Sequence, residues 1–457
     1  MKRLIETLKN IWKIKELRRR ILFTLALIFV YRYGSFVVLP GVVPGALVNA
    51  TKDQNSLFGL INMFTGGAFN KAAIFALGIM PYITASIIVQ LMGFAVPYFQ
   101  RLQNKEGESG RKKISQITRI LTLFITLVQG GGYLTYLMST PGVVSPHVPP
   151  SVFWFTNIIL LSTGTIFAMW MGEKITDKGI GNGVSLLIMV GIIARFPAAI
   201  IAEFTLDMNG GGLFKFIVVI ALFYLITMAT IAIVQAVRKI PIQFAKRMVG
   251  RGVHQMPVSG ARDYIPVKLN AAGVMPIIFA QAIMFLPVTI VTYIAGNEAL
   301  ASSDFLRALT NPYSVPSSIF AFLLVVVFTY VYTALIVDPK KYAEYLKQQN
   351  AFIPGVKPGK ATSDYIDAIV SRITLPGAVF LGIITILPAF AVNLFGVTPA
   401  FATFFGGTSL IILVGVVLDT LQQVESYLLM RKYDGLVKSG KIMGRASGGL
   451  QGIGAPM

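Results

Sequence analysis

The sequence has no cysteine and only two histidines, His147 and His254. Without cysteine the chain forms no disulfide and offers no thiolate ligand to a metal. Two histidines in predicted loops also disfavour a histidine-based catalytic or metal centre. Charged residues are scarce, at 13% of the 457 residues, while 55% are hydrophobic. A soluble domain is usually about 25% charged, so this composition predicts a protein that crosses a membrane several times.

A helix needs about 20 mostly apolar residues to span a bilayer. Ten stretches meet this requirement, and the fold class is therefore an all-α polytopic membrane protein. The basic N-terminus leads into a full-length apolar run without a small-residue cleavage site, so the first helix is expected to be retained. The predicted spans are 21–38, 72–92, 117–138, 152–171, 183–202, 213–236, 271–294, 317–337, 374–394 and 407–430.

The basic residues predict the orientation. If both termini are cytoplasmic, the segments on the cytoplasmic side hold 34 of the 40 lysines and arginines. The remaining six are Arg32, Lys52, Lys71, Arg195, Lys215 and Arg307. Cytoplasmic loops of membrane proteins are enriched in Lys and Arg, so this asymmetry supports the span count. It also accounts for most of the net charge of +21.

Ten spans with both ends on one side divide into two halves of five, about 1–205 and 206–457. Five is odd, so the second half is inverted relative to the first. Inverted repeats place a functional site near the middle of the bilayer, between the halves. Two cytoplasmic loops, about 237–270 and 338–373, are long and basic, and loops of that length usually have a function.

Three function classes fit such a protein. A coupled secondary transporter needs ionisable groups inside the membrane, but the predicted span cores hold almost none. An intramembrane enzyme needs a nucleophile with its base, or metal ligands, and neither is evident. A channel with an apolar gate and basic docking loops agrees best with the composition, and a solute transporter with inverted repeats is the alternative.

Residues 62–82, NMFTGGAFNKAAIFALGIMPY, interrupt the expected second span. They carry Gly66 and Gly67, a charge at Lys71, and Pro81 between apolar residues. A proline inside a helix removes one backbone donor and kinks the helix. The stretch therefore predicts a chain that enters the membrane, breaks and starts again.

Five stretches resemble the bacterial SecY family, in the family's order and spacing, and together cover the chain nearly end to end. They are IFALGIMPYITASIIVQL, KEGESGRKKISQITR, GEKITDKGIGNG, AFIPGVKPG and FGGTSLIILVGVVLD. GIGNG alone could be taken for a phosphate-binding loop, but no strand precedes it and it reads as a tight turn between spans 4 and 5. The resemblance implies a protein-conducting channel that passes unfolded secretory proteins and releases hydrophobic segments sideways into lipid.

The resemblance also implies which residues form the pore and its closure. Tight apolar constrictions close a pore by excluding water, although an isoleucine at helical spacing is more often a core or lipid-facing residue. The implied pore ring is Ile79, Ile83, Val184, Ile188, Ile278 and Ile412. A plug at about 57–70 would close the outer side, or that segment is a re-entrant loop that fills a cavity. The implied plug and hinge residues are Phe58, Ile61, Met63, Phe64, Gly66 and Gly67.

A lateral gate is implied between spans 2 and 3 on one side and spans 7 and 8 on the other. Thr84, Gln129 and Gln281 lie on three of these spans. Hydrogen bonds between membrane helices contribute only about 0.6 kcal/mol on average, which suits a gate that must break and reform. The alternative is that each of these polar residues faces water in the funnel.

The implied partners are the SecE and SecG subunits, the SecA motor or the ribosome, signal peptides and nascent chains, and membrane lipid. Lys246, Arg251 and Lys357 match the family's docking positions, although the family usually has arginine at the last. Lysine lacks the planar fork of arginine. Binding of anionic lipid is the alternative role for these loops. The resemblance implies the bacterial cytoplasmic membrane and no enzyme, metal or cofactor, with any ATP hydrolysed by SecA.

Overall fold

The computed structural model describes most of the chain in one helical body with a small β-sheet. The described residues are 12, 14–47, 62, 64–104, 107–209, 212–244, 247–249, 256–258, 262–281, 283–284, 311 and 313–438. The helices are α2 (Lys15–Gly34), α5 (Met80–Ala95), α6 (Pro97–Asn104), α7 (Gly107–Ser139), α8 (Pro150–Lys178), α9 (Gly183–Asn209), α10 (Leu213–Gln235), α14 (Val315–Ile336), α15 (Pro339–Gln348), α16 (Lys360–Phe395), α17 (Pro399–Ala402) and α18 (Gly407–Lys438).

Nine of the ten predicted spans overlap one of these helices. Within the described residues, seven helices are long and apolar enough to cross a membrane, and a shorter apolar helix covers Met80–Gly93. The predicted span 271–294 is helical over 275–281, and most of its remainder lies outside the described residues. Several helices run beyond the predicted apolar core, as α16 does by beginning at Lys360.

The predicted start of the second span, at residue 72, is wrong. Helix α5 begins at Met80, and the residues before it form a series of turns. Ala72 and Gly78 have φ of 46° and 53°, a left-handed conformation that a regular α-helix excludes. Pro81 lies in the first turn of α5. A proline costs no hydrogen bond there, so Pro81 starts this helix and does not kink it.

The loop 237–270 contains a β-hairpin, which was not among the predicted elements. Strands β1 (Val237–Phe244) and β4 (Arg262–Lys268) pair antiparallel, with Ile240 opposite Ile265. Strand β5 (Ala351–Phe352) adds to the other edge of β1, and β2 (Arg247–Val249) pairs with β3 (Met256–Val258). Ile240 and Ile242 pack with Leu346 of α15 and Ile366 of α16 in a separate core. The two long basic loops therefore form one folded unit.

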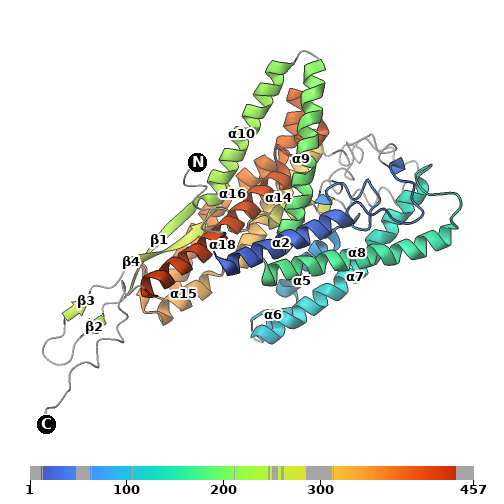
Figure 1. Ribbon diagram of the computed structural model, residues 1–457. Coiled ribbons are helices and arrows are strands. Elements are labelled where there is room, and N and C mark those ends of the chain that lie inside the picture. Colours follow the sequence, from blue (N-terminus) through green and yellow to red (C-terminus); the bar gives the residue numbers. More distant parts are fainter. Residues whose placement is uncertain are drawn as a thin grey trace, which may run out of the picture.

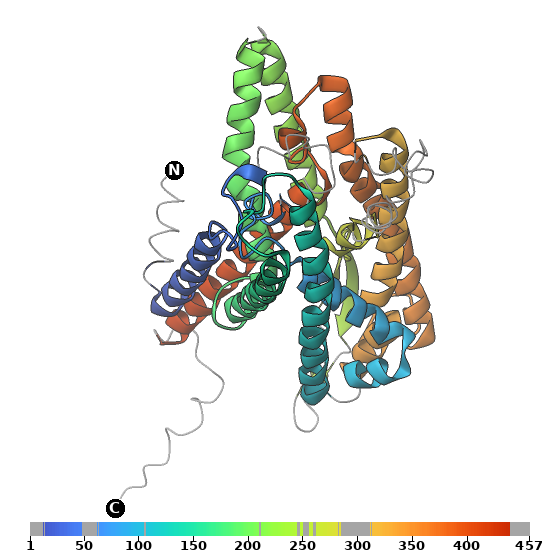
Figure 2. The same cartoon turned by 90° about the vertical axis from the view of Figure 1, so that its right-hand side faces the viewer.

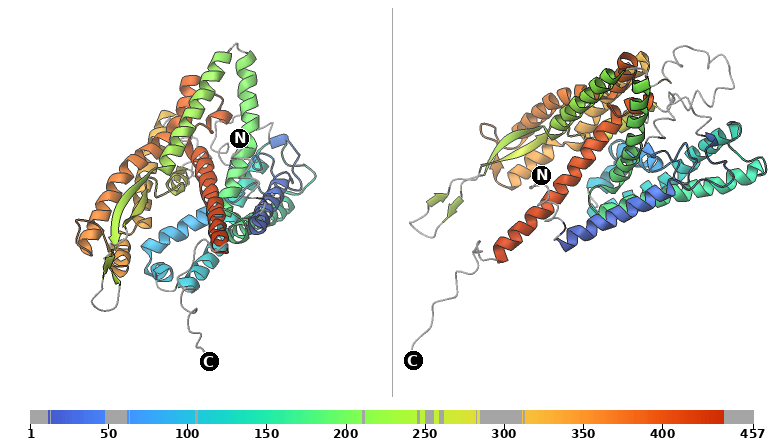
Figure 3. Two further views of the ribbon diagram at one scale, coloured as in Figure 1. Left: turned by 60° about the vertical axis from the view of Figure 1, so that its left-hand side comes forward. Right: turned by 45° about the horizontal axis from the view of Figure 1, so that its top comes forward.

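The helices form two groups around a shared centre (Figures 1, 2 and 3). Helices α2, α7 and α8 gather on one side, α14 and α16 on the other, and α9 and α18 lie between them. The main apolar core draws buried residues from α5, α8, α9 and α18, together with the turns before α5. The β-hairpin lies at one end of the molecule and the α9–α10 tips at the other. We call the end that carries β1 and β4 the hairpin face.

Candidate functional site: an apolar constriction between two cavities

The described part of the 57–70 segment folds back into the centre of the molecule. Gly66 and Gly67 adopt left-handed φ values of 65° and 92°, which glycine tolerates because it has no Cβ. The Gly67 amide donates to the Asn62 carbonyl at 2.8 Å, and the Asn70 amide donates to Asn62 Oδ1 at 3.0 Å. These bonds close a compact turn that places Phe64 in the core, with 6% of its surface exposed.

Two other helices hold this turn. Arg32 of α2 donates through Nη1 to the Gly66 carbonyl at 2.7 Å. A Cβ added to Gly191 of α9 would lie 2.4 Å from the Phe64 carbonyl oxygen and 3.2 Å from the Gly66 nitrogen. Only a glycine at position 191 permits this approach, because real Cβ atoms do not come that close to a backbone oxygen.

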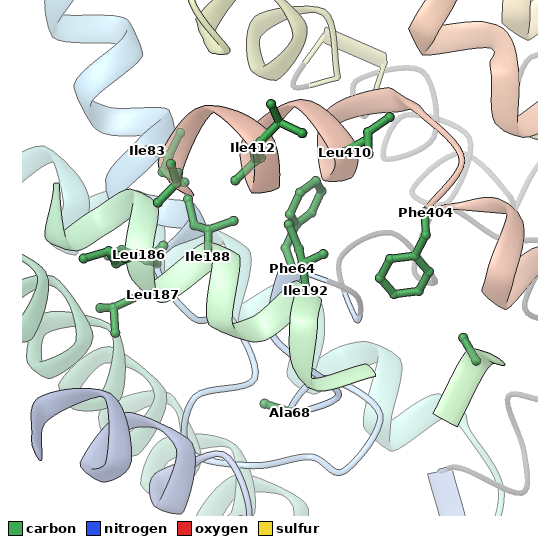
Figure 4. Packing of buried hydrophobic residues seen from close by; sticks show 14 of the residues in the cluster. Phe64, Ala68, Ile83, Leu186, Leu187, Ile188, Ile192, Phe404, Leu410 and Ile412 are labelled. Atoms are coloured by element: carbon green, nitrogen blue, oxygen red, sulfur yellow. The ribbon is translucent and has the colours of Figure 1, made fainter. Parts of the chain in front are cut away.

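Four of the six predicted ring residues form a constriction at the centre. Ile83 of α5, Ile188 of α9 and Ile412 of α18 are buried, with exposed fractions of 7%, 5% and 3%, and Ile278 packs against the same core. Figure 4 shows Ile83, Ile188 and Ile412 converging from three helices, with Phe64 beside them. These four isoleucines also border a 20 Å³ void together with Phe64.

A larger cavity of about 720 Å³ lies on the hairpin side of the constriction. Ile83, Ile188, Ile278 and Ile412 line this cavity as well, so they separate it from the void beside Phe64. Away from the isoleucines its wall mixes apolar residues with polar and charged ones, among them Lys268 and Asp419. We call this cavity the funnel.

The other two predicted ring residues lie next to the constriction. Val184 lines the funnel but not the void. Ile79 is the residue before the first turn of α5 and is buried. Its Cδ1 lies 3.4 Å from a Cβ built on Gly172 of α8, and it lines neither cavity. The structure thus brings four of the six into the constriction.

An ion pair between two helices forms part of the funnel wall. The Arg119 guanidinium of α7 donates through Nε and Nη2 to the two carboxylate oxygens of Glu173 of α8, at 3.1 and 2.7 Å. Paired Arg–carboxylate bonds fix both the distance and the relative orientation of the two groups. The pair therefore fixes α7 against α8 beside the opening of the funnel.

The three predicted gate residues are not bonded to one another. Thr84 Oγ1 donates to the Met80 carbonyl of its own helix at 3.1 Å, and Gln281 Nε2 donates to Thr408 Oγ1 of α18 at 3.1 Å. Thr84 and Gln281 line the same small void, whereas Gln129 is exposed on α7. The structure brings two of the three together.

A different pair bridges the two sides of the predicted gate. Tyr332 of α14 donates its hydroxyl hydrogen to Gln90 Oε1 of α5 at 3.3 Å, and Gln90 Nε2 donates to Ser86 Oγ at 3.3 Å. Phe279 stacks on Phe328 and contacts Tyr332. This pair is not among the predicted gate residues. Polar residues at Ser86 and Gln90, four apart on one face of an apolar helix, are the signal that points to it.

The remaining predicted residues are exposed or lie outside the described part of the chain. Lys357 is exposed, and its carbonyl accepts a hydrogen bond from Thr362 Oγ1 at 2.9 Å. Phe58, Ile61, Met63, Lys246 and Arg251 lie outside the described residues. Within the described part, no group of three or more His, Cys, Asp or Glu side chains could hold a metal ion.

Long apolar helices surround an apolar constriction that lies between two cavities. This arrangement defines the class as a membrane channel for polypeptides or solutes. A family model named SecY matches residues 73–421. The protein translocase subunit SecY of Thermus thermophilus is 42% identical over 447 residues, covering 96% of this chain and 99% of that protein. The one from Chlamydia muridarum is 37% identical over 460 residues, covering 96% and 99%. The chain therefore belongs to the SecY family.

Solved structures show the same fold at low sequence identity. A structure of a protein-conducting channel matches with a TM-score of 0.58 at 17% identity, covering 90% of this chain and 92% of that one. Sec61 in a canine ribosome-channel complex matches with a TM-score of 0.55 at 16% identity, covering 90% and 92%. The predicted ten-span all-α fold is thereby confirmed. The family match also confirms the prediction of a translocation channel that is not an enzyme.

Proposed function

We propose that unfolded polypeptides cross the membrane through the funnel, the constriction and the space that the plug now fills. The observation that carries this path is the placement of Ile83, Ile188, Ile278 and Ile412, which line the funnel on one side and the void beside Phe64 on the other. Branched aliphatic side chains in a narrow ring exclude water and ions from a resting pore. They also yield to a passing chain, because they make no directional bonds.

Phe64 and the turn through Gly66 and Gly67 form the plug in this proposal. Phe64 lies against the constriction, so the plug must leave before a chain can pass. Hydrogen bonds from other helices hold it, including those from Arg32 Nη1 to the Gly66 carbonyl and from the Tyr133 hydroxyl to the Phe69 carbonyl, and it packs closely on Gly191. A short irregular segment opens more easily than the long helices around it, which supports its displacement as an early step.

The lateral gate is proposed to lie between α5 and α14, with the helix that begins at Met275 beside them. Gln90 and Tyr332 join its two sides by a single neutral hydrogen bond. Gln281, bonded to Thr408, and Thr84, bonded within its own helix, supply further polar groups near the gate. Gln129 is exposed and its part in the gate rests on the family resemblance alone. A hydrophobic segment leaving the pore would part α5 from α14 and enter lipid.

The hairpin face is proposed to face the cytoplasm, with both chain termini on that side of a bacterial cytoplasmic membrane. The distribution of lysine and arginine supports this orientation. The two basic loops form one folded unit through β1 and β5, and this supports a docking platform with Lys246, Arg251 and Lys357.

The platform is proposed to bind the SecA motor and the ribosome, and the channel is proposed to assemble with SecE and SecG. Two similar structures support the ribosome as a partner, since each of those proteins is bound to a ribosome: canine Sec61 and yeast Ssh1. Basic loops attract phosphate-rich RNA. Signal peptides, nascent chains and membrane lipid are the other proposed partners.

A crosslinking experiment tests the path. A secretory chain stalled in transit, carrying a photoreactive residue, should crosslink to Ile83, Ile188, Ile278 and Ile412. Exposed Ile120 of α7 is the control and should remain unlabelled. Labelling confined to funnel residues such as Asp419, with none at the four isoleucines, would reject the path and favour a solute transporter. In planar bilayers Ile278→Ser should raise the resting ion conductance, because a hydroxyl supports water in the constriction.

A further inference from the structure

An apolar groove lies between the ends of α14 and α16 that point away from the hairpin face. Side chains from residues 315–323 of α14 form one wall, and side chains from residues 386–394 of α16 form the other. Its volume is about 510 Å³, and among the described residues it shares no lining residue with the funnel or with the void at the constriction. The two helices run side by side in this part of the molecule (Figure 2). We call this feature the outer groove.

The few polar side chains in the outer groove are bonded to backbone carbonyls. Ser318 Oγ donates to the Ser314 carbonyl at 2.8 Å, and the Tyr313 hydroxyl donates to the Pro399 carbonyl at 3.2 Å. Asn393 Nδ2 donates to the Tyr313 carbonyl at 3.0 Å. An enclosed water needs about 2–4 polar partners, and these bonds leave few for it. An empty groove would lose the dispersion contacts of its walls, so the groove favours an apolar occupant.

The outer groove opens onto the surface that faces lipid. Ile319 and Leu323 in its α14 wall are 56% and 55% exposed, and Leu394 in its α16 wall is 73% exposed. The exposed apolar surface continues along α14 through Val327. Both helices are long and apolar enough to cross a membrane, so this surface lies in the hydrocarbon of the bilayer. The groove is therefore a recess in the interface between the channel and lipid, and acyl chains reach it directly.

The dimensions of the outer groove suit an acyl chain better than a helix. At about 1.5 Å per residue, the wall at 315–323 is roughly 12 Å long, and one leaflet of hydrocarbon is roughly 15 Å thick. Packed helices lie about 8–10 Å apart, whereas a helix with its side chains is about 10–12 Å across. A helix therefore cannot enter between α14 and α16. Membrane helices also dock through small residues, but the exposed walls here carry Val315, Ile319, Phe390 and Leu394.

We propose that the outer groove is a binding site for one phospholipid acyl chain from the leaflet opposite the hairpin face. The chain lies between the walls at Ile319 and Phe390 and extends from Asn393 toward Ile386. Asn393 is exposed near the end of α16, where the polar ester linkage of the lipid would lie. None of the described residues that line the groove is charged, so the site recognises the chain and not the headgroup.

Photolabelling of the channel in nanodiscs tests the site. A phosphatidylcholine with a diazirine on one acyl chain labels the residues that the chain contacts, and mass spectrometry maps them. Ala389 and Tyr313 are 7% and 9% exposed but line the groove, whereas Ile120 of α7 is 72% exposed. The proposal expects heavier labelling at Ala389 and Tyr313 than at Ile120. Labelling that follows exposure at all three residues is what passing contact with surrounding lipid gives, and it would overturn the proposal.

A variant that fills the groove tests the same site. Ser318→Leu places a larger apolar side chain in the groove, so the excess labelling at Ala389 should be lost. Thr163→Leu is the matched control and should keep that labelling, because Thr163 is exposed on α8 and its hydroxyl also donates to a carbonyl of its own helix. If Ser318→Leu does not accumulate, Ile386→Trp replaces it. Labelling at Ala389 that persists in the filled channel contradicts the proposal.

Two further arms identify the occupant. A phosphatidylglycerol probe with the same photoreactive chain should label Ala389 as strongly as the phosphatidylcholine probe does, and a strong preference for either would mean that the headgroup is recognised. A photoreactive amino acid at Leu323, introduced into the channel in its native membrane, should crosslink to lipid. Crosslinks mainly to a polypeptide would overturn the proposal and assign the outer groove to a partner protein.

Discussion

The Tyr332 hydroxyl donates a hydrogen bond to Gln90 Oε1 across 3.3 Å and thereby joins α14 to α5. The two residues are 242 positions apart in the sequence, so the bond links the two halves of the chain directly. It lies where the proposed gate must open.

Removing this bond should ease gate opening slightly. A hydrogen bond between membrane helices contributes about 0.6 kcal/mol on average, which corresponds to roughly threefold in an equilibrium constant. Tyr332→Phe should therefore raise the export of substrates with weakened signal peptides by roughly threefold. Tyr330→Phe, two residues away on the same helix, is the control and should change nothing. A double-mutant cycle with Gln90→Leu should show coupling, and additive single effects would mean that the bond does not act in gating.

Seating of the plug should depend on the missing side chain at Gly191. In Gly191→Ala the new Cβ would overlap the Phe64 carbonyl, at 2.4 Å. The plug is then displaced, and the resting conductance in planar bilayers should rise. Alanine itself favours a helix over glycine by about 1 kcal/mol, so a loss of closure would come from the clash. Gly131→Ala on α7 is the control, because its nearest neighbour is a Trp154 side-chain atom at 3.6 Å. Equal conductance in the two variants would contradict the seating.

Hydropathy and charge in the sequence predict the spanning helices well, because burial in lipid requires long apolar runs wherever the chain crosses. Hydropathy does not predict where α5 begins. The residues from Ala72 to Gly78 are as apolar as the rest of the predicted span, but left-handed backbone at both positions prevents a helix there. The β-hairpin is missed because its sequence signal is weak. Apolar and polar residues alternate poorly along β1 and β4, and β4 carries a proline at Pro266.

The site is predicted only where one helix determines it. Ile83 lies on the face of α5 that the resemblance implies, and the structure places it at the constriction. Pairs that depend on how distant helices pack are missed, such as Gln90 with Tyr332. The bond from the Thr398 amide to Glu203 Oε2 is missed because the predicted fifth span ends at residue 202, whereas α9 continues through Glu203 and Asp207. A buried acid is evident only after the helix is known to extend that far.

The Arg32 guanidinium should hold the plug in place. Arg32 Nη1 lies 2.7 Å from the Gly66 carbonyl oxygen, and a hydrogen bond from a charged donor contributes about 1.5–3 kcal/mol. Arg32→Met leaves that carbonyl without its donor, so backbone amides of residues 64–70 should exchange hydrogen with solvent on the order of tenfold faster or more. Mass spectrometry in detergent or nanodiscs measures this rate. Arg19→Met changes an exposed arginine on the same helix and should leave the exchange rate unchanged. If residues 64–70 exchange slowly in both variants, Arg32 does not anchor the plug.

Charge reversal at Lys357 should weaken motor-driven export without unfolding the channel. The side chain is exposed, and within the described part of the chain its carbonyl accepts a hydrogen bond from Thr362 Oγ1. Lys357→Glu should therefore lower SecA-dependent translocation into vesicles several-fold, and the deficit should grow at low salt, where screening is weakest. Lys360→Glu, which makes the same charge change three residues later at the start of α16, is the matched control. An equal loss in both variants would show that the platform responds to net charge alone and that Lys357 is no specific contact, whereas a loss confined to Lys357→Glu supports docking at that residue.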